Sequence, residues 1–136
     1  MMADKLQLSI VTPERHMVTD EVDQVNVPGT EGDMGILFDH SPLFSTLRPG
    51  QLSYEKDGEE VALVVSDGYV EVTSNRVTIL AETAEYVSGI DRERAEEARK
   101  KAEALIAKGG LEEDELREAQ KKLFRALARL EHSQSN

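Results

Sequence analysis

The spacing of apolar residues changes once along this chain, near Ile90–Asp91, and this change constrains the fold more than any single residue. Before it, apolar residues tend to alternate, as at Leu6, Leu8 and Ile10. After it, they recur every three or four positions from Ala95 onward. A period of two is typical of half-buried strands, and a period near 3.6 is typical of amphipathic helices. The sequence therefore predicts a β module followed by a helical module.

Turn-forming pairs divide the first module into many short segments, which is typical of a β-sandwich or barrel. Asp57-Gly58 between two strand patterns is the clearest hairpin signal. We expect strands at Lys5–Val11, Val22–Pro28, Met34–Leu37, Leu43–Leu47, Gln51–Lys56, Val61–Ser66, Tyr69–Thr73 and Arg76–Glu82.

The helical module has the start and stop signals of two helices. Asp91 is suited to cap the first helix, and Lys108-Gly109-Gly110 ends it. The short connection makes the two helices antiparallel neighbours. We therefore predict a β-sandwich in residues 1–86, an antiparallel hairpin in 87–132 and a frayed tail in 133–136. Two helices cannot form an independent core, so the hairpin can stay docked or leave, which favours a binding and switching protein over a rigid enzyme.

Composition excludes several classes of function. The formal net charge is −11, from 27 acidic and 16 basic residues, so a nucleic acid is repelled overall. Cysteine is absent, which excludes disulfides and thiolate metal sites. The longest apolar run, Val61–Val65, is far shorter than the roughly 20 residues of a membrane span. Any work at a membrane would therefore go through another subunit.

No motif of a known catalytic centre is present. The chain lacks a phosphate-binding P-loop, a His-Glu-x-x-His helix and a nucleophile elbow. His16, His40 and His132 stand alone in the sequence. We expect no catalytic residues and no metal site, the alternative being a His–carboxylate site that folding assembles from distant segments.

The loop of residues 29–47 is the first candidate contact site. Its turn-forming residues carry Glu31 and Asp33 outward, and His40 before Ser41-Pro42 indicates an ordered corner with the imidazole bonded to backbone. The alternative is an ordinary barrel corner with solvated acids.

Basic residues at one end of the predicted hairpin form the second candidate. Arg125 and Arg129 lie more than about 100° from the apolar stripe of their helix and one turn apart, where like charges repel unless an anion bridges them. Antiparallel packing brings Arg94 to the same end, with Glu85 and Asp91 around it. Such a group suits a polyphosphate at a helix start. A solvated basic face remains the alternative.

Several motifs in a fixed order resemble one protein family. They are Gly35-Ile36-Leu37, His40-Ser41-Pro42-Leu43, Leu47-Arg48-Pro49-Gly50, Gly68-Tyr69-Val70-Glu71-Val72 and Val77-Thr78-Ile79-Leu80-Ala81. Over its whole length the chain resembles the epsilon subunit of bacterial-type rotary F-type ATP synthase. The resemblance implies a β-sandwich of about ten strands and a helical hairpin.

The resemblance also implies a function without catalysis. Such subunits bind the central-stalk gamma subunit and the c-ring, rotate with both, and couple proton-driven rotation to ATP synthesis. Their hairpin can rise into the alpha/beta catalytic head and inhibit ATP hydrolysis. The implied location is the cytoplasmic side of the cell (inner) membrane, peripheral and attached only through the c-ring. The loop Glu31–Asp33 with His40 matches the part of the family that meets the c-ring.

Some family members bind ATP through an Ile/Leu-Asp-x-x-Arg-Ala motif, which this chain matches. The resemblance maps the regulatory nucleotide site onto Glu85, Ile90, Asp91, Arg94, Ala95, Arg125 and Arg129. No cofactor is implied as required, and ATP is implied as a regulatory ligand. The alternative function is therefore an ATP-sensing module that acts mainly as a regulator.

Two positions depart from the family pattern. Phe38-Asp39 stands where the family commonly has Pro-Gly, and Asp67 stands where it commonly has Gly. We expect a differently shaped corner before His40 and a less permissive turn at Asp67.

Overall fold

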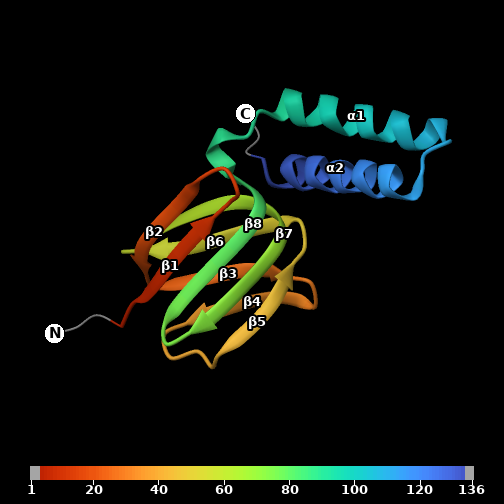
Figure 1. Cartoon of the computed structure of the whole chain (residues 1–136). Coiled ribbons are helices and arrows are strands. Elements are labelled where there is room, and N and C mark those ends of the chain that lie inside the picture. Colours follow the sequence, from red (N-terminus) through yellow and green to blue (C-terminus); the bar gives the residue numbers. More distant parts are fainter. Residues whose placement is uncertain (1–3, 134–136) are drawn as a thin grey trace. The chain divides into compact units, whose positions relative to one another are not determined.

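The computed structural model describes residues 4–133 and divides the chain into two compact units, Met1–Tyr86 and Val87–Asn136. Figure 1 labels their elements. The first unit holds β1 (Leu6–Val11), β2 (His16–Val22), β3 (Gln24–Gly29), β4 (Gly32–Leu37), β5 (Leu43–Leu47), β6 (Gly50–Lys56), β7 (Glu59–Thr73) and β8 (Arg76–Tyr86). The second holds a 3-10 turn, η1 (Val87–Gly89), and the helices α1 (Arg92–Lys108) and α2 (Glu113–His132).

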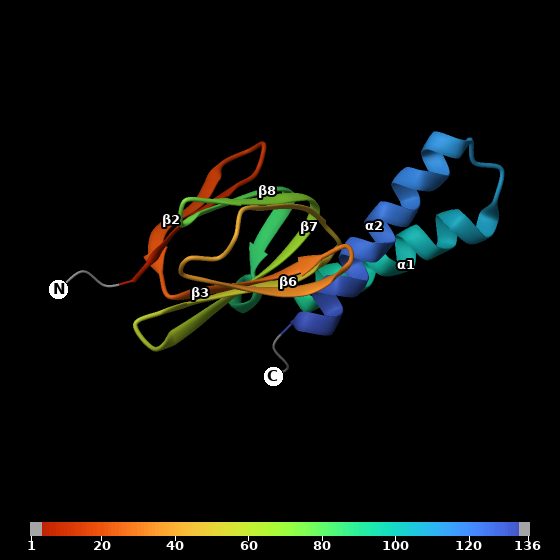
Figure 2. The same cartoon turned by 90° about the horizontal axis from the view of Figure 1, so that it is seen from below.

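The strands of the first unit form a sandwich in which β7 and β8 run through both sheets. One sheet has the order β2-β1-β8-β7-β5, with β1 parallel to β8. It contains the C-terminal half of β7 and the N-terminal half of β8, which pair with each other. In the other sheet the remaining halves continue into β6, β3 and β4. Figure 2 shows β3 and β6 on one side of this unit and β8 on the other.

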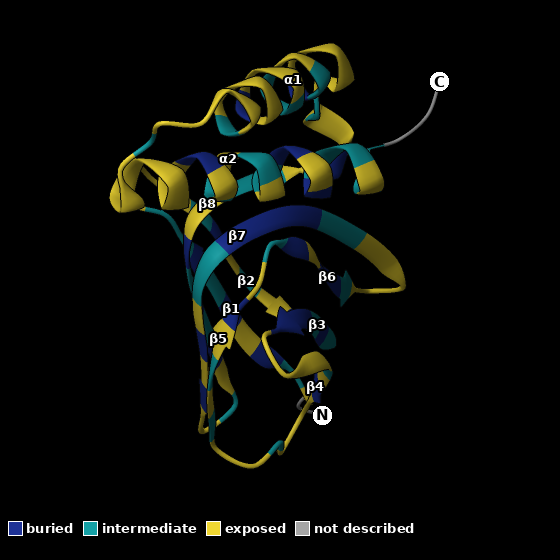
Figure 3. Ribbon diagram, turned by 90° about the vertical axis from the view of Figure 1, so that its right-hand side faces the viewer, coloured by how far each residue is buried: buried dark blue, intermediate teal, exposed yellow. Residues whose placement is uncertain are grey.

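Residues of the β-sandwich core come from the inward positions of every strand. The centre of β7 is buried between exposed ends (Figure 3). The largest fully buried side chains are Leu6, Leu8, Ile10, Ile36, Leu52, Leu63, Ile79, Val22, Val25, Val27, Val65 and Val70. Burial of a Leu, Ile or Val side chain contributes roughly 1.5–3 kcal/mol, so this cluster holds the sandwich together.

β7 changes sheets at Asp67-Gly68. Asp67 has a positive φ of 50°, and Gly68 pairs with Leu47 on one side and Ala81 on the other. A Cβ built at Gly68 would lie 1.8 Å from the Leu80 carbonyl oxygen, so only glycine fits this close approach of two backbones. Asp67 thus stands in the left-handed region, which glycine adopts more readily than aspartate.

The predicted fold class is confirmed, with differences in strand detail. Within residues 4–133 the structure has eight strands rather than about ten. Because β7 and β8 each contribute to both sheets, these eight strands give ten strand segments. The expected strands Val61–Ser66 and Tyr69–Thr73 are one strand, because Asp67-Gly68 bends the chain without reversing it. The prediction missed β2, an edge strand whose inward residues are only partly apolar.

The second unit is the predicted antiparallel hairpin. The Asp91 side chain caps α1 by accepting a hydrogen bond from the Arg94 backbone N–H, as predicted. A capping box between Glu112 and Glu115 starts α2, and Gly109, at a positive φ of 76°, ends α1. Ser133 is the C-cap of α2, and residues 134–136 of the predicted tail lie outside the described residues.

Candidate functional site

The start of α1 contains four of the residues predicted to bind a nucleotide. The Asp91 carboxylate lies 3.1 Å from the Arg94 backbone nitrogen, and the Ala95 N–H donates to the Asp91 carbonyl at 3.0 Å. Ala95 is fully buried, Ile90 is half-buried, and Arg94 is exposed. The Asp91 carboxylate already accepts a hydrogen bond from one of the N–H groups that the first turn leaves unpaired. An anion here would therefore compete with Asp91 for that N–H group or bind the Arg94 side chain.

The remaining predicted residues lie on two other elements. Arg125 and Arg129 lie half-buried in the second half of α2, on either side of the fully buried Ala126. In an antiparallel pair this is the end of the hairpin where α1 begins. Glu85 lies on β8 opposite Val64, within the first unit. The structure thus gathers six of the predicted residues at one end of the hairpin and places Glu85 on a strand. The six are Ile90, Asp91, Arg94, Ala95, Arg125 and Arg129.

The two acids of the other predicted site lie at and just after the turn between β3 and β4. Glu31 lies in the turn, Asp33 is the second residue of β4, and both are exposed. Asp33 forms an ion pair with Arg48, a residue the sequence did not single out for this role. Arg48 also donates to the Gly29 carbonyl at 2.5 Å. One of the two acids is therefore balanced by a local cation, which leaves Glu31 as the more negative point of this turn.

His40 lies at the opposite end of β4 from these acids. In the ladder of β3 and β4, Gly29 pairs with Gly32 at the turn and Gln24 pairs with Leu37 at the far end. His40 follows Leu37, and its backbone N–H donates to the Leu37 carbonyl at 3.1 Å. Five strand steps span about 17 Å. The strand register therefore places His40 and the acids Glu31 and Asp33 at opposite ends of β4.

The corner at His40 is ordered, as predicted. The His40 Nδ1 atom lies 2.7 Å from the Ser41 carbonyl oxygen. Asp39, at a positive φ of 65°, stands in the backbone conformation that glycine favours. Asn75, from the turn between β7 and β8, accepts from the Asp39 N–H at 2.7 Å and so fixes the corner. This contact spans 36 residues of sequence, so no local pattern could have revealed it.

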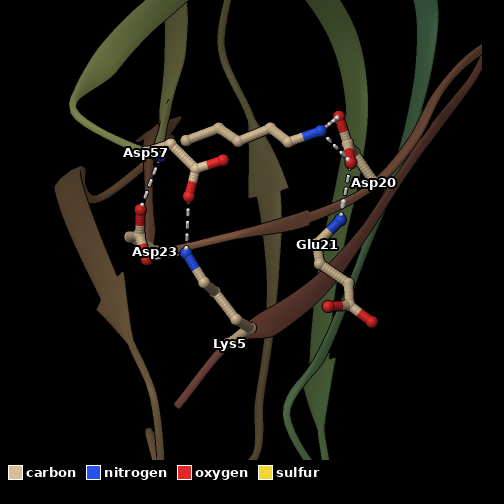
Figure 4. Close-up of polar contacts among 6 residues, drawn as sticks. Lys5, Asp20, Glu21, Asp23 and Asp57 are labelled. Carbon is tan, nitrogen blue, oxygen red and sulfur yellow. Dashed lines mark hydrogen bonds and ion pairs between the residues drawn. The ribbon is translucent and has the colours of Figure 1, made fainter. Parts of the chain in front are cut away.

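A cluster of ion pairs lies near the β6–β7 turn (Figure 4). Lys5 contacts Asp23 at 2.5 Å and Asp57 at 3.3 Å, and Lys56 contacts Asp20 at 2.7 Å. Hydrogen bonds with these lysines hold the pKa of Asp23 and Asp20 below its usual range. The same contacts raise the pKa of Lys5 and Lys56. The cluster joins Lys5, just before β1, to two turns and links Lys56 to β2. Asp20, Asp23 and Asp57 each pair with a lysine, which is typical of a structural cluster.

Within residues 4–133, no helix is long and apolar enough to cross a membrane. In the same residues, no group of three or more His, Cys, Asp or Glu side chains is arranged to hold a metal ion.

Two family models together match nearly the whole chain. The model of the ATP synthase delta/epsilon chain beta-sandwich domain matches residues 5–87, and the model of the delta/epsilon chain long alpha-helix domain matches residues 88–134. The chain belongs to the ATP synthase delta/epsilon chain family. The boundary between the two matches falls one residue after the boundary between the two units.

Curated relatives of this family match along most of their length. The ATP synthase epsilon chain of Herpetosiphon aurantiacus is 47% identical over 126 residues, which are 93% of this chain and 92% of the relative. That of Geotalea daltonii is 41% identical over 130 residues, 96% of this chain and 94% of the relative. The predicted family, and with it a non-catalytic subunit of ATP synthase, is confirmed.

Two solved structures share the fold. A chain of the Euglena gracilis mitochondrial ATP synthase, in a structure of OSCP, F1 and c-ring, has a TM-score of 0.77 at 22% identity, covering 94% of this chain and 81% of that one. A chain of the Tetrahymena thermophila mitochondrial ATP synthase, from a central stalk and c-ring structure, has a TM-score of 0.58 at 16% identity and covers 93% of this chain and 92% of that one. At these identities the likeness concerns the fold alone.

Proposed function

We propose that this epsilon-family chain is a rotor-stalk subunit that couples proton-driven rotation to ATP synthesis and inhibits ATP hydrolysis through its helical hairpin. The observation that carries the proposal is the agreement of two boundaries. The family models change from sandwich to helix between residues 87 and 88, and the chain divides into compact units after Tyr86. A two-unit chain can keep one unit bound while the other changes position.

In this proposal the β-sandwich binds the gamma subunit and the c-ring. The exposed Glu31 turn offers negative charge to basic or polar c-ring loops, and His40 offers a second contact at the other end of β4. Structures that share this fold are described as a central stalk with c-ring and as an assembly of F1 and c-ring. The chain would be peripheral on the cytoplasmic side of the cell (inner) membrane, held there by the c-ring.

The hairpin would reach the alpha/beta catalytic head. Its helices bury alanines, while Leu105, Phe124 and Leu127 are at least 42% exposed. Alanine burial stabilises little, and a population change from 1:99 to 99:1 needs only about 5.5 kcal/mol of differential binding. Contacts with the head could supply that difference.

The test is truncation after Tyr86 in the assembled enzyme. Without residues 87–136 the complex should still assemble, because the sandwich and its core are intact, and its ATP hydrolysis should rise. The matched control deletes only residues 134–136, which follow Ser133, the last described residue. Failed assembly of the truncated complex contradicts the partner assignment, and unchanged hydrolysis contradicts the inhibitory role.

A second function, ATP sensing, is favoured by the group from Ile90 to Arg129 at one end of the hairpin. Titration calorimetry of ATP into the isolated chain should give binding that Arg94→Ala abolishes. Arg117→Ala is the control, since Arg117 pairs with Glu113 and Asp114 on its own helix. Absence of heat at millimolar ATP would remove this function and leave the first intact.

A further inference from the structure

Arg92 connects the two ends of the hairpin. It is the first residue of α1, yet its Nη1 atom donates to the Leu130 carbonyl of α2 at 3.2 Å and to the Ser133 hydroxyl at 2.7 Å. The Ser133 hydroxyl itself donates to the Leu130 carbonyl at 3.2 Å. One guanidinium thus contacts both the C-cap residue of α2 and a carbonyl of its last turn.

The position of this charge is unfavourable with respect to the macrodipole of its own helix. The N-terminus of a helix carries partial positive charge, so a cation in the first turn of α1 is repelled. The C-terminus of α2 carries partial negative charge and unpaired carbonyls, which attract a cation. Within α1, hydrogen bonding with Arg99 and, to a smaller extent, the charge of Arg92 hold the pKa of the Glu96 carboxyl below its usual range, so Arg92 also has an attractive partner on its own helix. The contacts of Arg92 with Leu130 and Ser133 exist only while the end of α2 lies beside it.

The apolar contacts between α1 and α2 stabilise the hairpin only weakly, so a polar contact can make a significant contribution to its stability. The residues that α1 and α2 bury are all alanines: Ala95, Ala102, Ala119, Ala126 and Ala128. Each offers one methyl group, so burial stabilises the pair far less than a leucine interface would. At the other end, residues 109–112 join the helices covalently.

We propose that Arg92 is a latch that holds the unconnected end of the hairpin closed by bridging the start of α1 to the end of α2. The latch depends on contacts within the second unit and not on the proposed function. Loss of the guanidinium should increase the population with separated ends roughly threefold to tenfold, the range of an ordinary hydrogen bond, because the site is partly exposed.

The test uses Arg92→Gln in the full chain, because glutamine is a good helix former of similar length without charge. Arg117→Gln is the matched control, an exposed arginine that pairs only within α2 in the contacts described above. The chain has no cysteine, so nitroxide labels on Glu93→Cys and Glu131→Cys can report the distance between the unconnected ends by double electron–electron resonance. Labels on Ala107→Cys and Glu113→Cys report the connected end.

Arg92→Gln should broaden the distance distribution at the unconnected end toward longer values and leave the connected end unchanged. Ser133→Ala, which removes one acceptor, should give a smaller change in the same direction. An unchanged distribution in Arg92→Gln, or equal broadening in Arg117→Gln, overturns the proposal. If circular dichroism shows that Arg92→Gln has lost helix, Ser133→Ala decides the question: broadening supports the latch, and no change refutes it.

Discussion

Substitution of Gly68 by alanine tests the close approach of β7 and β8, on which the two-sheet arrangement depends. The added Cβ would lie 1.8 Å from the Leu80 carbonyl oxygen and 2.8 Å from the Ala81 Cα atom. Both are backbone atoms, so no side chain can rotate away to make room.

The geometry sets the size of the effect. Cβ contacts below 3.0 Å essentially never occur in real structures, so β7 and β8 would have to separate by about 1.2 Å at this point. That displacement strains the pairing of Gly68 with both Leu47 and Ala81. Overpacking against flexible side chains costs about 1–3 kcal/mol, and a rigid backbone contact should exceed it. We expect a loss of at least about 3 kcal/mol in the free energy of unfolding, a large share of the 5–15 kcal/mol typical of a domain.

Tyrosine signals make the measurement specific to the sandwich. The chain has three tyrosines, Tyr54, Tyr69 and Tyr86, and no tryptophan, so near-ultraviolet circular dichroism during urea unfolding reports the first unit. Gly35→Ala is the matched control, because a Cβ there meets only side-chain atoms, the nearest at 3.3 Å.

The result that refutes the reasoning is a Gly68→Ala protein within about 1 kcal/mol of the unsubstituted chain. Such a value, no larger than a well-tolerated core substitution, would mean that the strands have room to part where β7 changes sheets.

Three further substitutions test other parts of the structure. Asp23→Asn should lower the thermal midpoint at pH 7, and the difference from the unsubstituted chain should shrink in acid. The pKa of Asp23 is lowered beside Lys5, so its contribution to stability is present above the ordinary carboxyl pKa and is lost as the pH falls through the lowered value. An equal difference at pH 7 and pH 2 would contradict this. Asp91→Ala should remove the cap of α1 and cost about 1 kcal/mol, seen as reduced helical circular dichroism; unchanged helicity would count against the cap. Leu63→Ala, at a fully buried position of β7, should cost about 2–5 kcal/mol in urea unfolding, and a cost near zero would show that the core collapses around the cavity.

Sequence periodicity predicted the two-module fold because both modules follow simple local rules. Inward strand positions are apolar at every second residue, and the helix start at Asp91 has the residue that caps require. The same rules failed at Asp67-Gly68. Asp67 has a positive φ, and Gly68 allows the close approach of another backbone. These two features occur in tight turns and also in bends of a continuous strand. Only the pairing with distant strands decides between them.

The candidate sites were less predictable, because their contacts join residues far apart in the chain. Asp33 was recognised as an outward acid, but its partner Arg48 lies 15 residues away. The family resemblance grouped His40 with Glu31 and Asp33, but it gave no distance between them, and the register of β3 and β4 places them at opposite ends of β4. Register, which local patterns specify weakly in a glycine-rich strand, determines such distances.

Arg92 shows where local preference and tertiary structure conflict. A cation at a helix N-terminus opposes the macrodipole, although Glu96, four residues later on α1, attracts it. The contacts with Leu130 and Ser133, at separations of 38 and 41 residues, add a favourable partner that no local pattern could reveal. Gly68 is the matching case in the sandwich, since glycine weakens a strand interior unless another backbone comes close. In both cases a residue that contradicts the preference of its own element lies where two distant segments of the chain meet.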